Sequence, residues 1–138
     1  MEPRKLTGRV QWMGAVDWNR RLFDTLIPLP DGTSYNAYLI KGSEKTVLID
    51  AVDPAMQSIL LHQLKGVERI DYIVSQHTEQ DHSGAIPILL EKYPKSTLLC
   101  SEKAKGLLID HLLIDPARIK TVAEEETLSL GDCNLKFY

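Results

Sequence analysis

Six consecutive residues of this 138-residue chain, positions 77–82, read His-Thr-Glu-Gln-Asp-His and carry two imidazoles and two carboxylates. No other stretch of the sequence concentrates so many groups that can bind a metal ion. The stretch follows residues 70–75 (IDYIVS), which predict a buried strand, and precedes residues 85–93, which predict a helix. A loop between a strand and a helix is where a rigid scaffold usually presents a site. The sequence therefore predicts a functional loop that the rest of the chain supports.

The composition is typical of one globular domain. Hydrophobic residues make up 43% of the chain and charged residues 25%, and a chain of this length can bury a core of its own. The formal net charge is −3 and the sequence has no basic cluster, so the electrostatic footprint of a nucleic-acid-binding protein is missing. The apolar runs are too short to span a membrane and the first residues do not form a signal peptide. We therefore expect a cytoplasmic protein without membrane association.

The order of the predicted elements indicates an α/β chain. Residues 33–41 and 46–50 predict two strands that form a hairpin with its turn near Gly42. After this hairpin, predicted strands alternate with helices, two of which begin after the favoured N-cap residues Asp53 and Ser101. Because strands separated by helices usually pair in parallel, we expect parallel connections in the middle of the chain.

His111 and the two cysteines, which lie outside the loop, are interpreted as structural. His111 belongs to a predicted helix whose expected buried face comprises Ala104, Leu107, Leu108, His111 and Leu112. A histidine on such a face is interpreted as a core or boundary residue rather than a metal ligand. Cys100 and Cys133 form no C-x-x-C pattern, and we expect them to be small buried hydrophobic residues.

The ligand chemistry of the loop suggests two metal ions. In an extended chain alternate residues point the same way, so His77, Glu79 and Asp81 would lie on one side, with His82 reaching round. One small ion does not easily accept all four ligands from so short a stretch. Two adjacent ions are the more natural interpretation, one bound by His77 and Glu79 and the other by Asp81 and His82. The absence of a thiolate suits iron, manganese or zinc, and the carboxylates favour iron. The alternative is a polar loop whose charges are only solvated. Against it, the flanking strand and helix fix the ends of the loop, and Gly84 allows close packing beside the loop.

The motif H-x-E-x-D-H in a strand-to-helix loop resembles the metal motif of the flavodiiron proteins, also called A-type flavoproteins. The resemblance covers nearly the whole chain, and it includes five further blocks at residues 12–18 (WMGAVDW), 31–40 (DGTSYNAYLI), 47–50 (VLID), 71–74 (DYIV) and 100–103 (CSEK). It implies an α/β (α+β sandwich) structure with the metallo-β-lactamase-like αββα fold. Residues 1–138 would form the N-terminal portion of this di-iron domain, without the flavodoxin-like FMN domain of the family.

The resemblance also implies a function. The family reduces dioxygen to water, nitric oxide to nitrous oxide, or both, at a non-haem di-iron site that receives electrons from FMN, with rubredoxin or a flavin reductase as the donor. By resemblance, His77 and Glu79 would hold one iron, and Asp81 and His82 the other. Asp50 would orient the loop from behind the ligands. No catalytic residue is implied beyond the ligands.

The chain departs from the family pattern in two ways. The remaining ligands of the family, a His, a bridging Asp and a final His, have no counterpart within residues 1–138, and Asp24 stands where some members carry a His. We therefore expect weak metal binding and little or no reductase activity from this chain. An incomplete sandwich exposes an apolar sheet face, which predicts self-association or pairing with the missing C-terminal half.

Two other functions stay open. The first is a metal-dependent hydrolase of the same fold with a metal-bound hydroxide as nucleophile. Glu79 speaks against it, because the hydrolases carry H-x-H-x-D-H with a second imidazole at this position. The second is a non-catalytic half-domain that only oligomerises or binds a partner.

Overall fold

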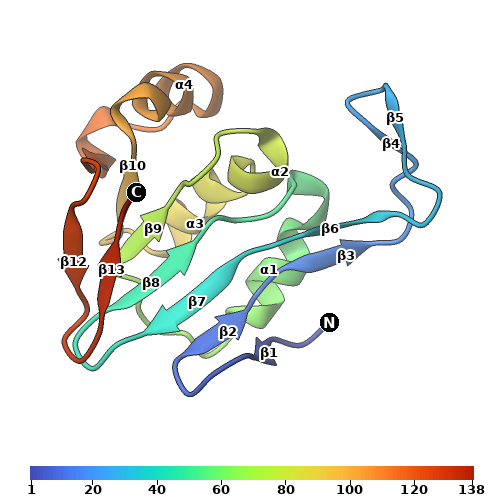
Figure 1. The fold of residues 1–138 in the computed structure, drawn as a ribbon. Helices are drawn as coiled ribbons and strands as arrows, with labels where there is room; N and C mark the ends of the chain where they lie inside the picture. The colour runs from blue at the N-terminus through green and yellow to red at the C-terminus, as the bar shows by residue number, and fades with distance from the viewer.

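A seven-stranded mixed sheet forms the centre of the computed structural model, which describes residues 1–138 (Figure 1). Its strands, in spatial order, are β1 (Arg4–Lys5), β2 (Val10–Trp12), β7 (Tyr38–Lys41), β8 (Thr46–Ile49), β9 (Tyr72–Val74), β10 (Thr97–Cys100) and β11 (Ile119–Thr121). The strands from β1 to β8 pair antiparallel, and those from β8 to β11 pair in parallel. The expected hairpin followed by parallel connections is confirmed.

Three two-stranded ribbons accompany the central sheet. They are β3 (Ala15–Asp17) with β6 (Thr33–Tyr35), β4 (Leu22–Phe23) with β5 (Ile27–Pro28), and β12 (Thr127–Ser129) with β13 (Asn134–Lys136). The single strand expected over residues 33–41 is divided into β6 and β7, because the first part leaves the sheet to pair with β3. The predicted alternation persists across the break, and Tyr35, Ala37 and Leu39 are all buried.

Helices cover one face of the sheet. They are the 3-10 helices η1 (Pro54–Met56) and η2 (Pro116–Arg118) and the α-helices α1 (Gln57–Gln63), α2 (Gln80–Ser83), α3 (Ile86–Lys92) and α4 (Glu102–Leu112). The side chains of Asp53 and Ser101 accept hydrogen bonds from the first turns of η1 and α4, as N-cap residues do. The main core lies between these helices and the sheet, where Leu48, Ile73 and Leu98 of three neighbouring strands are fully buried.

Helix α4 buries a narrower face than the sequence predicts. Leu108 is fully buried, and Ala104 and Leu112 pack against the core beside it. Leu107 is 47% exposed and His111 is exposed, so their expected place in the core is wrong. The physical reason is that residues four apart form one row on a helix. Only the row of 104, 108 and 112 reaches the core, and the neighbouring row of 107 and 111 does not.

The β12–β13 hairpin lies on the other face of the sheet and begins a second layer (Figure 1). Val47, Val74, Leu99 and Leu130 form a smaller buried cluster on this side. A cleft of about 730 Å³, lined mostly by apolar side chains, lies between the sheet and the hairpin. The chain thus forms a helix–sheet–hairpin arrangement with metallo-β-lactamase-like layering. No helix is long and apolar enough to cross a membrane.

Candidate metal centre

The candidate loop leaves the carboxyl end of β9 and enters the short helix α2 after Glu79. The chain does not stay extended beyond this residue, because the Glu79 carbonyl accepts hydrogen bonds from the amides of His82 and Ser83, both at 2.9 Å. The Ser83 hydroxyl also donates to the carbonyls of Thr78 (2.8 Å) and Glu79 (3.0 Å). This first turn of helix therefore decides where the four candidate ligands point.

The four candidate ligands lie in two pairs. His77 Nε2 is 3.2 Å from Glu79 Oε1, and His82 Nε2 is 3.5 Å from Asp81 Oδ2. The two imidazole rings are neighbours, with centroids 5.2 Å apart and planes at 76°. No group of three or more His, Cys, Asp or Glu side chains is placed so that it could hold a metal ion. The Nε2 atom of each imidazole faces one carboxylate of the loop, Glu79 for His77 and Asp81 for His82.

Asp50 stands behind the loop, directly after β8. Its Oδ1 accepts a hydrogen bond from the Gln76 backbone amide (2.8 Å), and its Oδ2 lies 3.2 Å from His82 Nδ1. A proton on Nδ1 would make this contact a hydrogen bond to Asp50 and would leave the lone pair on Nε2. Asp50 is 4% exposed and has a φ of 55°, a left-handed conformation that is strained for a residue other than glycine. From the sequence, Asp50 is indicated as a supporting residue only by the family resemblance. The sequence does not predict Gln76 as the partner of Asp50.

The loop is also packed closely at its far end. A Cβ on Gly84 would lie 2.6 Å from the Gln80 carbonyl oxygen and 2.6 Å from Pro54 Cδ. The Ala51 amide donates to the His82 carbonyl at 2.8 Å. The close packing expected at Gly84 is therefore present, and it is between α2 and the turn that follows β8.

The donor set fits metal ions of the iron, manganese and zinc class. Two donors that share such an ion at ~2.1 Å lie about 3 Å apart when they bind at right angles. The separations within the two pairs are 3.2 and 3.5 Å. The imidazole nitrogens that face the carboxylates of the two pairs are the Nε2 atoms, and in His82 a proton on Nδ1 would leave this atom able to bind a cation. The residues present could therefore hold two ions, each through one imidazole and one carboxylate.

His111 and the two cysteines lie outside the loop and differ in burial. His111 lines a groove of about 600 Å³ together with Glu79 and Gln80, a position that its sequence pattern did not predict. Cys100 is buried, and burial raises the pKa of its thiol above the usual value, so it stays protonated and is a poor metal ligand. Cys133 is also free and partly buried.

The helix-covered mixed sheet, the hairpin on its other face and the ligand-rich loop at the end of β9 together define a metallo-β-lactamase-type domain. The chain belongs to the metallo-β-lactamase superfamily, and the family profile of that description matches residues 30–133. Within this superfamily the chain is similar over its whole length to flavodiiron proteins.

Three relatives illustrate this similarity. A nitric oxide reductase of Moorella thermoacetica is 37% identical over 99% of this chain. The structure of rubredoxin oxygen:oxidoreductase from Desulfovibrio gigas superimposes with a TM-score of 0.92 at 36% identity, again over 99% of the chain. The flavodiiron protein from Giardia intestinalis superimposes with a TM-score of 0.89 at 27% identity over 99% of the chain. The chain spans 35%, 34% and 34% of these three proteins, respectively.

Proposed function

We propose that this chain supplies part of the non-haem di-iron site of an oxidoreductase that reduces dioxygen to water, nitric oxide to nitrous oxide, or both. The observation that carries the proposal is the pairing of each imidazole with one carboxylate in the loop, His77 with Glu79 and His82 with Asp81. Glu79 supports iron over the zinc of a hydrolase, because it places a carboxylate where the hydrolases have an imidazole. Bound iron would supply the redox-active centre at which the gas is reduced.

In this proposal the residues of the chain hold and orient the ions. His77 and Glu79 bind one iron, and Asp81 and His82 bind the other. Asp50, 3.2 Å from His82 Nδ1, would hold a proton on that nitrogen and so direct Nε2 toward the metal. A buried carboxylate that orients a histidine strengthens the binding of that histidine to the ion, although the carboxylate itself does not contact the ion.

The similarity to longer proteins supports a wider assignment. Residues 1–138 would be the N-terminal portion of a di-iron domain, and FMN on a flavodoxin-like domain would deliver electrons from a donor such as rubredoxin or a flavin reductase. Relatives named nitric oxide reductase and rubredoxin-oxygen oxidoreductase support both candidate substrates. Each of these relatives has about three times the length that the chain covers.

Removal of one proposed ligand provides the first test. We expect Asp81→Ala to lower the iron bound per chain after anaerobic loading with Fe²⁺ to about half, because His82 alone remains for the second ion while His77 and Glu79 still hold the first. The measurement is metal analysis of the desalted protein. Asp110→Ala, an exposed carboxylate on α4, is the matched control and should retain the iron. Equal iron content in the wild type and Asp81→Ala would contradict the ligand assignment.

The same preparations separate the three candidate functions. Stoichiometric zinc with ester or lactone hydrolysis would support the hydrolase, and no bound metal under any loading would support a non-catalytic domain. The isolated 138-residue chain should consume little or no dioxygen or nitric oxide with an artificial electron donor. Rapid turnover by this chain alone would contradict the proposal that further ligands are needed.

The cleft between the sheet and the β12–β13 hairpin predicts association. Its lining includes Ile40, Ile49, Leu135 and Phe137, and apolar surface of this kind favours contact with another protein surface. We expect the isolated chain to sediment as a dimer or larger species at micromolar concentration, and Leu135→Glu to shift it toward the monomer. Leu113→Glu, which changes an exposed leucine outside the cleft, is the control. A monomeric wild-type chain would contradict this prediction.

A further inference from the structure

The β4–β5 hairpin, residues 22–28 and called the arm here, has few contacts of its own to hold it. Figure 1 shows the arm standing away from the sheet, on the side of the fold where α2 lies. Only two residue pairs join its strands, Leu22 with Pro28 and Phe23 with Ile27. Leu26, near its tip, is 81% exposed. A two-stranded hairpin of this size is not stable by itself, so its position must come from contacts at its base.

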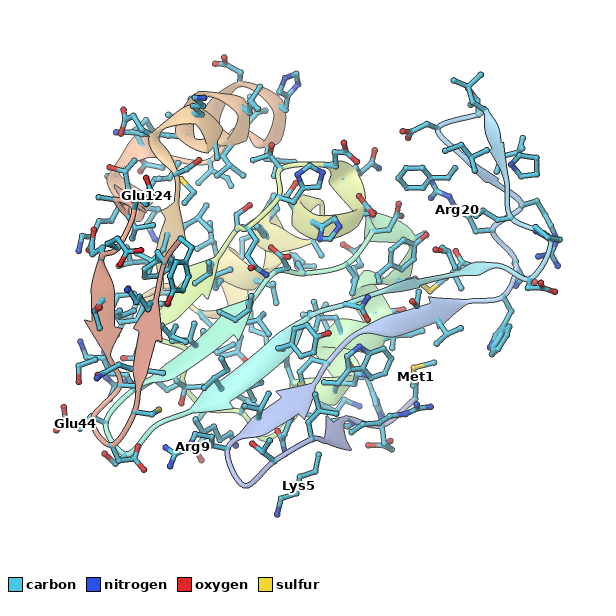
Figure 2. The ribbon with its side chains drawn as sticks, in the orientation of Figure 1. Met1, Lys5, Arg9, Arg20, Glu44 and Glu124 are labelled. Carbon is cyan, nitrogen blue, oxygen red and sulfur yellow. The ribbon has the colours of Figure 1, made fainter.

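Arg20 supplies these contacts. Figure 2 shows it at the base of the arm, on the side that faces the body of the fold. Its Nε donates to the Leu22 carbonyl (3.1 Å), and its Nη1 donates to Asp53 Oδ2 (2.9 Å). The guanidinium also lies 5.9 Å from the centre of the Phe23 ring. One forked side chain therefore binds the arm with one nitrogen and the turn after β8 with another.

The ion pair has a buried acidic partner. The side chain of Asp53 is 6% exposed and that of Arg20 is 29% exposed. Asp17, which is also buried, accepts from the backbone amides of Asn19 (3.0 Å) and Arg20 (3.1 Å) and so fixes the main chain at this point. Removing the guanidinium would leave the buried Asp53 carboxylate without its cation, which is far more costly than losing an exposed pair.

Asp53 belongs to a short segment that also holds the candidate metal loop. This segment, residues 50–54 and called the bracket segment here, contacts the loop at three points. Asp50 meets His82 and the amide of Gln76, the Ala51 amide donates to the His82 carbonyl, and Pro54 packs against Gly84. Residues 50–53 are all buried. The arm and the loop are therefore both attached to one short, largely buried piece of chain.

We propose that Arg20 is a positioning residue that couples the arm to the candidate metal loop through its ion pair with Asp53 and the bracket segment. The significance of this coupling for metal binding rests on the proposed function. The arm and the loop then keep one relative arrangement, and loss of the ion pair loosens both. An arm that is merely attached to the surface would loosen alone.

Hydrogen exchange of the metal-free chain tests the coupling directly. We expect Arg20→Met to speed amide exchange about tenfold or more in both residues 22–28 and residues 76–84. Arg21→Met is the matched control, because Arg21 donates only to the Trp18 carbonyl and has no contact with Asp53. Faster exchange in the arm with an unchanged loop in Arg20→Met would overturn the proposal.

A second variant guards against general unfolding and identifies the ion pair. Asp53→Asn keeps an oxygen that can accept from the Ala55 amide and cap η1, but it loses the charge that faces Arg20. We expect Asp53→Asn to reproduce the faster exchange of Arg20→Met, and the double variant to add little, because both substitutions break one interaction. Fully additive effects of the two substitutions would overturn the proposal. Arg20→Lys keeps a charge near Asp53 but loses the fork, so it should protect the loop better than the arm.

Cobalt binding connects the coupling to the site. We expect Arg20→Met to weaken Co²⁺ binding about tenfold, measured from the visible absorption of the bound ion, while Arg21→Met leaves it unchanged. Unchanged Co²⁺ affinity in Arg20→Met would overturn the link to the site. If the wild-type chain bound no Co²⁺ or iron, the proposed function would fail, and the exchange experiment would still decide the coupling.

Discussion

Replacing Asp50 with alanine is expected to lower the free energy of unfolding by about 3 kcal/mol and to weaken metal binding by about 10–100-fold. The buried carboxylate receives the Gln76 amide at 2.8 Å and holds His82 Nδ1 at 3.2 Å. Alanine leaves that amide without a partner and frees the imidazole to rotate. Urea unfolding of the metal-free chain and Co²⁺ titration measure the two effects separately.

The left-handed backbone at this position offers a matched pair of variants. Asp50→Gly loses the same contacts as Asp50→Ala, but glycine adopts the observed φ of 55° without strain. It should therefore be more stable than Asp50→Ala by about 1 kcal/mol. Both variants should bind Co²⁺ equally weakly, because neither orients His82. If either variant bound Co²⁺ as tightly as the wild type, the orienting role of Asp50 would be refuted.

Arg118→Met is expected to lower the free energy of unfolding by about 3 kcal/mol and the melting temperature by about 10 °C. The Arg118 guanidinium donates to the Ser96 carbonyl at 2.9 Å, to that of Tyr93 at 3.2 Å and to that of Leu90 at 3.4 Å. These carbonyls end helix α3 and lead into β10, where the backbone has few partners of its own. Methionine fills similar space but leaves the carbonyls without these donors.

Two comparisons identify the origin of this loss. Arg118→Lys should recover only part of the stability, because an ammonium group cannot reproduce the planar fork. Arg69→Met removes an exposed arginine that pairs with Asp71 and should cost less than about 1 kcal/mol. Thermal unfolding followed by circular dichroism measures all three variants. A melting temperature for Arg118→Met within 2 °C of the wild type would contradict this role.

The local sequence predicts elements and caps well because these depend on nearby residues. The N-caps at Asp53 and Ser101 and the alternation through Tyr35, Ala37 and Leu39 are present in the structure. The order of strands and helices also predicts the parallel pairing from β8 to β11, since helical connections return the chain in the same direction.

The local sequence predicts less well the directions in which the side chains of an element point. The chain does not stay extended through the loop, because hydrogen bonds from His82 and Ser83 to the Glu79 carbonyl start a helix there. Helix α4 was expected to bury His111, but only one row of its residues reaches the core. In both cases several conformations satisfy the local pattern, and packing against the rest of the fold selects among them.

The sequence by itself determined the location of the candidate site and its ligand chemistry, because four metal-binding side chains occur within six residues after a buried strand. Only the tertiary structure decided how these side chains pair and what stands behind them. Asp50 reaches His82 across 32 positions, and Arg20 reaches Asp53 across 33. Such contacts form where the fold brings distant segments together, and no local spacing rule encodes them.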